Sequence, residues 1–147
     1  MSRENVELVL GFIQPGPDVD FVPLFRDDDV WAVLAEATAP FYHADFEILA
    51  RGLPGGDKTY IGLDGMKAVW LDWLAPWATY RAEVEKAVDL GKRVLLLYHS
   101  FGRLEGSTTE IKDELASVWT IRDGKIAAVE FYATSHVEAL EAVGLSE

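Results

Sequence analysis

The sequence predicts an α+β fold in which a curved antiparallel (mixed) sheet wraps around three N-terminal and central helices. Helix-type periodicity occupies the first part of the chain, and strand-type runs follow one another from about residue 80 to residue 132. Residues 118–126 read VWTIRDGKI, so an Asp-Gly pair separates two β-rich segments. Asp-Gly between such segments is the strongest short-range hairpin signal. A long antiparallel sheet that follows helices can curve around them and enclose a pocket.

The length and composition predict one domain with a substantial core. The chain has 147 residues, of which 50% are hydrophobic and 12% aromatic, so we expect residues 1–147 to fold as a single domain. Asp and Glu number 25 against 13 Lys and Arg, which gives a net charge of -12. A charge of this sign repels phosphate backbones and anionic lipid, so we expect no nucleic-acid and no membrane partner. The same charge can also serve only as a solubility coat.

The absence of cysteine and of long apolar runs bears on location. Without cysteine, disulfide bonds, thiolate nucleophiles and cysteine metal sites are excluded, which fits a cytoplasmic protein. The first residues, MSREN, begin a polar amphipathic segment that lacks the apolar core of a signal peptide. No apolar run reaches the roughly 20 residues that span a bilayer. These features predict a cytoplasmic location.

Apolar spacing and terminal residues predict the first two helices. Residues 3–13 carry apolar side chains three and four positions apart, and a Pro-Gly-Pro run follows. After an irregular stretch or single helical turn over residues 18–24, Asp27 or Asp28 caps a second helix that Pro40 ends. The expected apolar stripe of this helix comprises Val30, Val33, Leu34 and Ala37.

A first strand, a loop and a third helix follow. Residues 41–50 alternate imperfectly, as expected for a strand with one buried face. The face expected to be buried comprises Tyr42, Ala44, Phe46 and Ile48, and the opposite face comprises His43, Asp45 and Glu47. A glycine-rich loop over residues 52–57 leads to a short strand over residues 58–61. Asp64 then caps a helix that runs to residue 74.

Four long strands and a short helix complete the chain. We expect strands over residues 79–89, 93–104, 109–121 and 125–134. In the first of these, Tyr80, Ala82, Val84, Lys86 and Val88 alternate with Arg81, Glu83, Glu85 and Ala87. The second strand is so apolar that both of its faces must be covered, which suggests a homodimer. Ser135 caps a last helix that runs to residue 143 and ends at Gly144.

Three local patterns in this order resemble the nuclear transport factor 2-like superfamily, and within it the SnoaL-like polyketide cyclase branch. Residues 60–66, YIGLDGM, are similar to the entry into that family's third helix. Residues 118–126 are similar to its last hairpin, and residues 138–145, EALEAVGL, to the tail of many members. The resemblance covers nearly the whole chain. It implies a cone-shaped α+β barrel, usually dimeric, with an apolar cavity between the helices and the concave sheet.

The family includes isomerases, dehydratases, epoxide hydrolases and polyketide cyclases, as well as proteins that bind without catalysis. This chain departs from the catalytic patterns of its ketosteroid isomerases and of its cyclases. Ketosteroid isomerases use a tyrosine of the first helix, where this chain offers Phe12. Their first-strand aspartate falls near Leu49 or Ala50. Cyclases of the family commonly carry a Glu-His-Trp-like run on the last strand, where residues 128–130 read AVE.

Family enzymes mostly move protons in a dry pocket, which needs a carboxylate or histidine with a burial-shifted pKa and a donor for the developing negative charge. On the first strand, His43 and Asp45 point to one side and form a plausible acid/base pair if that side is the cavity. If that side faces outward, the two residues are solvated surface groups.

His99 and Glu114 are the main candidates on the later strands. His99 lies in an apolar strand, where a neutral buried imidazole can act as base or donor, although a core histidine satisfied by one hydrogen bond has the same pattern. Glu114 shares a face with Ala116 and Val118, and desolvation would raise its pKa if that face lines the cavity. Otherwise Glu114 is an exposed charge.

The last strand and the tryptophans supply the remaining candidates. Glu130 has the same two interpretations as Glu114, and Tyr132 on its face could donate from its hydroxyl. The tryptophans most simply form core, but they could also make a flat wall for a ring-shaped ligand. These are Trp70, Trp73, Trp77 and Trp119.

Together these observations predict a small, cofactor-independent enzyme of the lyase, isomerase or cyclase type that acts on an apolar cyclic or polyketide-like molecule. His99 would be the general acid or base, with Glu114 or Asp45 as its charged partner and Tyr132 as donor. The alternative is a non-catalytic ligand-binding or dimerisation module. No phosphate loop or nucleophile elbow is present, so no cofactor is expected. His43, His99 and His136 lack metal-ligand spacing, so no metal is expected, and His136 is expected at the surface.

Overall fold

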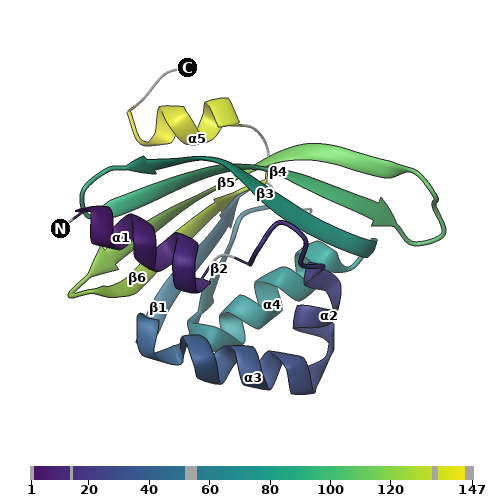
Figure 1. Cartoon of the computed structure of the whole chain (residues 1–147), viewed down its shortest axis with the longest axis horizontal. Helices are drawn as coiled ribbons and strands as arrows, with labels where there is room; N and C mark the ends of the chain where they lie inside the picture. The colour runs from purple at the N-terminus through teal and green to yellow at the C-terminus, as the bar shows by residue number, and fades with distance from the viewer. Residues whose placement is uncertain (1, 14, 52–55, 134–135, 145–147) are drawn as a thin grey trace.

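The computed structural model describes residues 2–13, 15–51, 56–133 and 136–144. The chain forms one six-stranded sheet with helices on both of its faces (Figure 1). The helices are α1 (Ser2–Leu8), η1 (Val9–Ile13, a π-helix), α2 (Phe21–Arg26), α3 (Asp28–Thr38), η2 (Ala39–Phe41, a 3-10 helix), α4 (Gly62–Leu74) and α5 (His136–Ala142). The strands are β1 (Tyr42–Arg51), β2 (Lys58–Ile61), β3 (Trp77–Asp89), β4 (Arg93–Leu104), β5 (Glu110–Arg122) and β6 (Lys125–Tyr132).

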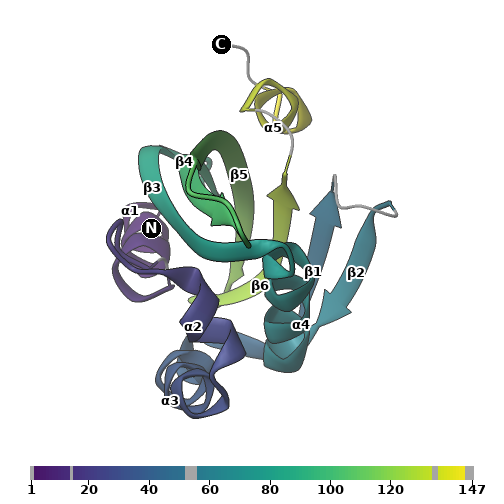
Figure 2. The same cartoon turned by 90° about the vertical axis from the view of Figure 1, so that its right-hand side faces the viewer.

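The sheet is mixed and open. Its strand order is β2-β1-β6-β5-β4-β3, so β2 and β3 form its two edges. β1 pairs with β6 in parallel, and each of the other neighbours pairs antiparallel. The sheet curves around α2, α3 and α4 (Figure 2). This arrangement confirms the predicted α+β fold with a curved sheet around helices, although the sheet does not close.

The last hairpin and most element boundaries agree with the sequence. β2 and β4 have the predicted bounds, and the Asp-Gly turn joins β5 to β6 with positive φ at Asp123 and Gly124. Of the two expectations for residues 18–24, the short helical piece is the one found, and it forms helix α2 over residues 21–26. The predicted cap of α4 was wrong, because α4 begins at Gly62, so that Asp64 lies in its first turn and Ile61 is the capping residue. The predicted loop over residues 52–55 and the Ser135 cap lie outside the described residues.

Helix α3 has the predicted start but a different buried face. The Asp27 side chain accepts hydrogen bonds from the backbone N–H groups of Asp29 and Val30, which confirms the cap. The predicted stripe was wrong, because Val33 is 70% exposed. Trp31 and Thr38 are buried instead. The bulky Trp31 determines which side of this alanine-rich helix faces the core, because its burial removes the largest apolar area from water.

Two strands depart from simple alternation. In β1, Phe46 and Ile48 are buried as predicted, but Ala44 is exposed next to an irregularity in the β1–β6 pairing. In β3, a register shift between Val84 and Lys86 inserts Glu85 as an extra residue. A β-bulge of this kind reverses the faces that follow it, so the alternation predicted across residues 80–88 holds only up to this point.

The sheet has an inner face, which packs against α2, α3 and α4, and an outer face, which packs against α5 (Figures 1 and 2). On β4 the inner residues are Val94, Leu96 and Tyr98, and the outer residues include Leu95 and Leu97. Helix α5 therefore covers the second apolar face of β4 within the chain itself. This coverage removes the reason for which the sequence suggested a homodimer. Within the described residues, no helix has the length and apolar character needed to cross a membrane.

Candidate functional site

An apolar pocket lies between the inner face of the sheet and the three helices that pack on it. Its volume is about 50 Å³, several times the roughly 10–15 Å³ that one water molecule needs on a comparable measure. Helices α2, α3 and α4 supply one wall, and β1, β5 and β6 supply the other. The described residues that line it are Pro15, Phe21, Phe25, Trp31, Leu34, Thr38, Tyr42, Leu63, Met66, Trp70, Trp119 and Phe131.

Trp70 is the centre of the aromatic wall of this pocket. The Phe25 ring stacks on it with centroids 5.5 Å apart. The Phe21 ring meets it edge-on at 5.1 Å, and the Phe131 ring does so at 5.5 Å. Offset-stacked and edge-to-face pairs each add about 0.5–1.5 kcal/mol beyond area burial. The wall is therefore held in place by several mutual contacts, and it offers ring faces and edges to a ligand.

Few polar side chains reach the pocket. The Thr38 hydroxyl donates to the Leu34 carbonyl oxygen at 2.8 Å, and the Trp119 indole N–H donates to the Ser117 hydroxyl at 2.7 Å. Tyr42 stacks on Phe46, and burial raises the pKa of Tyr42 well above its usual value. Tyr42 is therefore a neutral phenol that can donate a hydrogen bond. No carboxylate or imidazole is among the described lining residues.

A second, smaller cavity adjoins the pocket. Its volume is about 20 Å³, and it shares Trp70 and Phe131 with the pocket. Trp73, Val69 and Leu115 are among its other lining residues. Trp70 and Phe131 thus border both cavities.

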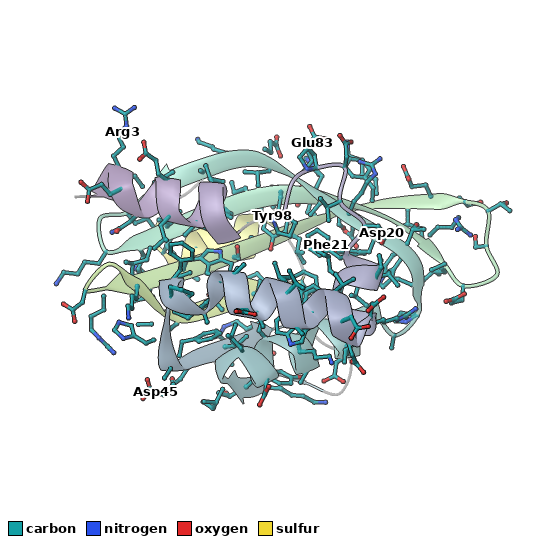
Figure 3. The ribbon with its side chains drawn as sticks, turned by 60° about the horizontal axis from the view of Figure 1, so that its bottom comes forward. Arg3, Asp20, Phe21, Asp45, Glu83 and Tyr98 are labelled. Atoms are coloured by element: carbon teal, nitrogen blue, oxygen red, sulfur yellow. The ribbon has the colours of Figure 1, made fainter. Side chains whose placement is uncertain are left out.

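The structure places the candidate tryptophans on the inner face. Trp70 and Trp119 line the pocket, and Trp73 lines the second cavity. Phe21 and Tyr98, which lie between sheet and helices, mark the same interior in Figure 3. This position is the one that a wall for a ring-shaped ligand requires.

The candidate acids and bases of β4 and β5 lie on the outer face, under α5. His99 and Glu114 are direct cross-strand partners. The His99 Nδ1 atom lies 3.3 Å from a carboxylate oxygen of Glu85. Glu114 accepts a hydrogen bond of 3.2 Å from the backbone N–H of His136. The face that carries Glu114, Ala116 and Val118 therefore packs against a helix and does not line the pocket.

His136 is part of this outer cluster, and the expectation that it lies at the surface was wrong. It is 6% exposed, and its Nε2 atom donates to the Tyr98 carbonyl oxygen at 3.0 Å. Its Nδ1 atom lies 4.0 Å from Glu85 and 3.9 Å from Glu114. Even so, the described part of the chain contains no group of three such side chains that could hold a metal ion.

Glu130 and Tyr132 form a separate polar network on the outer face. The Tyr132 hydroxyl donates to Glu130 at 2.8 Å, and Arg51 Nε lies 3.3 Å from the same carboxylate oxygen. Burial, followed by the hydrogen bond to Glu130, raises the pKa of Tyr132 to about 12. The Glu130 hydrogen bond in turn raises the pKa of Arg51. These contacts tie β1 to β6 and leave the Tyr132 hydroxyl engaged.

The two candidates on β1 lie apart from His99. His43 Nε2 donates to the Arg122 carbonyl oxygen at 2.7 Å. The His43 side chain lines an open groove of about 610 Å³, together with Asp64 and Lys125. Asp45 is exposed at the rim of the molecule (Figure 3). The predicted set of His99, Glu114, Asp45 and Tyr132 is thus not brought together in one cavity.

Sequence reasoning missed Tyr42, Thr38 and Trp31 as pocket residues. A signal for Tyr42 was present, because alternation in β1 placed it on the face of Phe46 and Ile48. Trp31 and Thr38 were hidden by the assumption that the valines of α3 face the core. Glu85 was missed because the bulge that moves it is not visible in the alternation.

The sequence matches one family model over most of its length. The model for the SnoaL-like domain matches residues 19–129. A search of curated proteins gives no match. The family model confirms the resemblance seen in the sequence motifs.

Solved structures with similar folds extend this comparison. TerC co-crystallised with polyporic acid has 21% identity and a TM-score of 0.61, over 95% of this chain and 98% of that one. A protein of Jannaschia sp. CCS1, assigned as a SnoaL-like polyketide cyclase, has 15% identity and a TM-score of 0.60, over 96% and 91%. A Catenulispora acidiphila protein with a ketosteroid isomerase-like fold, in complex with trimethylamine, has 17% identity and a TM-score of 0.57, over 90% and 95%. At these identities the likeness shows the fold.

Proposed function

Because this chain belongs to the SnoaL-like domain family, we propose that it binds a small apolar molecule in the pocket between the inner sheet face and helices α2 to α4. The observation that carries the proposal is the lining itself. It combines an aromatic wall with two hydroxyl-bearing side chains, Thr38 and Tyr42, and lacks a carboxylate or imidazole among its described residues. Apolar walls with a few placed polar groups are typical of small-molecule sites.

Even a ligand of one ring must shift side chains as it enters, because a cavity that holds benzene has a volume of roughly 150 Å³. At about 50 Å³ the pocket is far below the roughly 300 Å³ at which sites for drug-sized molecules begin. A larger, polyketide-like ligand would have to displace Trp70 or Phe131 and join the second cavity to the pocket. Solved structures of this fold hold ligands of different sizes: polyporic acid in TerC and trimethylamine in the Catenulispora protein.

A pocket-filling substitution tests this proposal. Leu34 lines the pocket, whereas its neighbour Val33 on the same helix is 70% exposed. We expect Leu34→Trp to weaken binding of ethylbenzene at least tenfold, because the larger side chain occupies the ligand's space. Val33→Trp is the matched control and should bind as the wild type does.

The measurement is isothermal titration calorimetry with ethylbenzene, with circular dichroism to verify that both variants fold. A folded Leu34→Trp protein that binds ethylbenzene with unchanged affinity would show that the ligand site lies elsewhere. Absence of binding to the wild type would also contradict the proposal.

A second candidate function is cofactor-independent catalysis of the lyase or isomerase type. It is favoured by the groove that carries His43, because this groove shares Tyr42 and Leu63 with the pocket. Since Nε2 of His43 donates to Arg122, its Nδ1 atom is the one available to accept a proton. Tyr42 would then donate to the oxygen on which negative charge develops.

Catalysis and binding make different predictions for His43. If the protein is an enzyme of this kind, His43→Gln should lower kcat by at least about a hundredfold on a turned-over substrate, which is the usual contribution of a general base, and leave binding intact. Unchanged turnover in His43→Gln would remove this assignment.

A further inference from the structure

Two polar atoms on the inner side of the sheet are buried without a partner. Within the described residues, neither the Tyr80 hydroxyl nor the Trp73 indole N–H forms a hydrogen bond. Tyr80 lies on β3 and is 1% exposed, and Trp73 lies on the last turn of α4. An unsatisfied buried polar group costs about 1–3 kcal/mol, so two of them close together need an explanation.

The Tyr80 and Trp73 side chains lie next to each other on the inner face. The rings of Trp73 and Tyr80 meet edge-on with centroids 6.2 Å apart. Ser100, which is also buried, lies on the neighbouring strand β4, one pair away from Tyr80 on the same face. Burial raises the pKa of Tyr80 to about 12, and the nearby Ser100 and Trp73 side chains oppose that rise. The Tyr80 hydroxyl and the Trp73 indole N–H therefore lie close to each other, and neither has a hydrogen-bond partner.

The donor and acceptor capacity of these three side chains determines which ligand atom they can bind. An indole N–H is a donor only, and the tyrosine and serine hydroxyls can each donate. A partner that satisfies the indole must therefore accept, as a ketone or phenolic oxygen does. Trp73 also lines the second cavity, which shares Trp70 and Phe131 with the pocket. A ring in the pocket that displaces one of these two side chains brings its substituent toward Trp73.

We propose that the Tyr80 hydroxyl and the Trp73 indole N–H form a subsite for an acceptor oxygen on the ligand, so that the protein prefers a ring carrying a ketone-type oxygen over the bare hydrocarbon ring. This inference rests on the proposed ligand pocket and specifies the class of molecule that it takes. Ser100 is the neighbouring hydroxyl that can complete the subsite.

Tyr98 supplies a matched comparison within the same face. It is 1% exposed and lies on β4, the strand paired with the β3 strand of Tyr80, so both phenols are buried on the inner face. Burial raises the pKa of Tyr98 well above its usual value, and the nearby Ser117 side chain opposes that rise. The Tyr80 hydroxyl is a buried polar atom without a hydrogen-bond partner, whereas the buried Tyr98 hydroxyl is not among such atoms, so only Tyr98→Phe is expected to remove a native interaction.

Two probes that differ by one oxygen atom test the subsite. Acetophenone carries a ketone oxygen that ethylbenzene lacks, and calorimetry gives the dissociation constant of each. In the wild type, the dissociation constant of ethylbenzene divided by that of acetophenone measures how strongly the protein prefers the ligand with the ketone oxygen. We expect Tyr80→Phe and Trp73→Phe each to lower this ratio about fivefold, the equivalent of one neutral hydrogen bond. Tyr98→Phe should leave the ratio unchanged.

Thermal unfolding of the same proteins separates a binding role from a structural one. Tyr80→Phe should melt no lower than the wild type, because it removes a hydroxyl that has no partner. Tyr98→Phe should melt lower. An unchanged ratio in both Tyr80→Phe and Trp73→Phe overturns the subsite while leaving the pocket intact. Failure of the wild type to bind either probe contradicts the pocket itself, and the subsite with it.

Discussion

Successive residues of β4 divide between two faces with different surroundings. Val94, Leu96 and Tyr98 face α2 to α4, whereas Leu95, Leu97 and His99 belong to the face covered by α5. The inner face has a pocket whose described lining residues include no carboxylate and no imidazole. The outer face carries the histidines and glutamates but is covered by α5, and the pocket does not reach it.

The ligand pocket and the residues that would suggest catalysis therefore lie on opposite faces of the sheet. A general base must lie within hydrogen-bond reach of the substrate. His99, Glu114 and His136 contact one another and Glu85 from the far side of the sheet, so the sheet itself lies between them and a ligand in the pocket. A fold of this family can therefore carry the residue types of an active site while using them to hold a helix.

The largest expected effect follows from truncating the centre of the inner face. Trp70→Ala should lower the free energy of unfolding by about 3–5 kcal/mol, as expected for loss of a large buried aromatic side chain. Chemical denaturation measures the change. A loss below about 1 kcal/mol would mean that the aromatic wall is not packed as described.

A smaller effect is expected from the outer cluster. Glu114→Ala removes the acceptor of the His136 backbone N–H, which should lower the free energy of unfolding by about 1 kcal/mol. The affinity for ethylbenzene should stay the same, because Glu114 does not line the pocket. A tenfold loss of ethylbenzene affinity in Glu114→Ala would contradict the claim that the outer cluster lies apart from the ligand site.

The smallest effect concerns pH, and it arises from the inner-face phenols. Burial raises the pKa of Tyr42, Tyr80 and Tyr98 in the folded protein, whereas an unfolded tyrosine titrates near about 10. Their contribution to stability is therefore fully present below pH about 10 and is lost as the pH rises through the folded values. Denaturation midpoints should fall above pH about 10. Tyr98→Phe should weaken that fall, and an equal fall in this variant would contradict the assignment.

Much of the fold could be predicted from local chemistry. The Asp-Gly turn needs positive φ at two successive residues, and Asp123 and Gly124 adopt it with φ of 55° and 76°. The continuous apolar run of β4 indicated burial on both faces, which the structure confirms. The covering element was misjudged, because an amphipathic α5 and a second protein copy would bury the same strand face.

The site was harder to predict, for a physical reason. Alternation of period two shows that Glu114 shares a face with Val118, but it does not show which face the sheet turns toward the helices. The bulge at Glu85 adds a second difficulty, because one inserted residue reverses every later assignment on β3. The tryptophans were easier, since large aromatic side chains are usually buried, and Trp70 and Trp119 are buried in the core.

The central claim is that the ligand site lies on the inner face of the sheet. A crystal structure of the protein grown with ethylbenzene tests it most directly. We expect electron density for the ring between α3, α4 and the inner face, in contact with Trp70 and Phe131. Density for the ring on the outer face, beside His99 and Glu114, would contradict the claim.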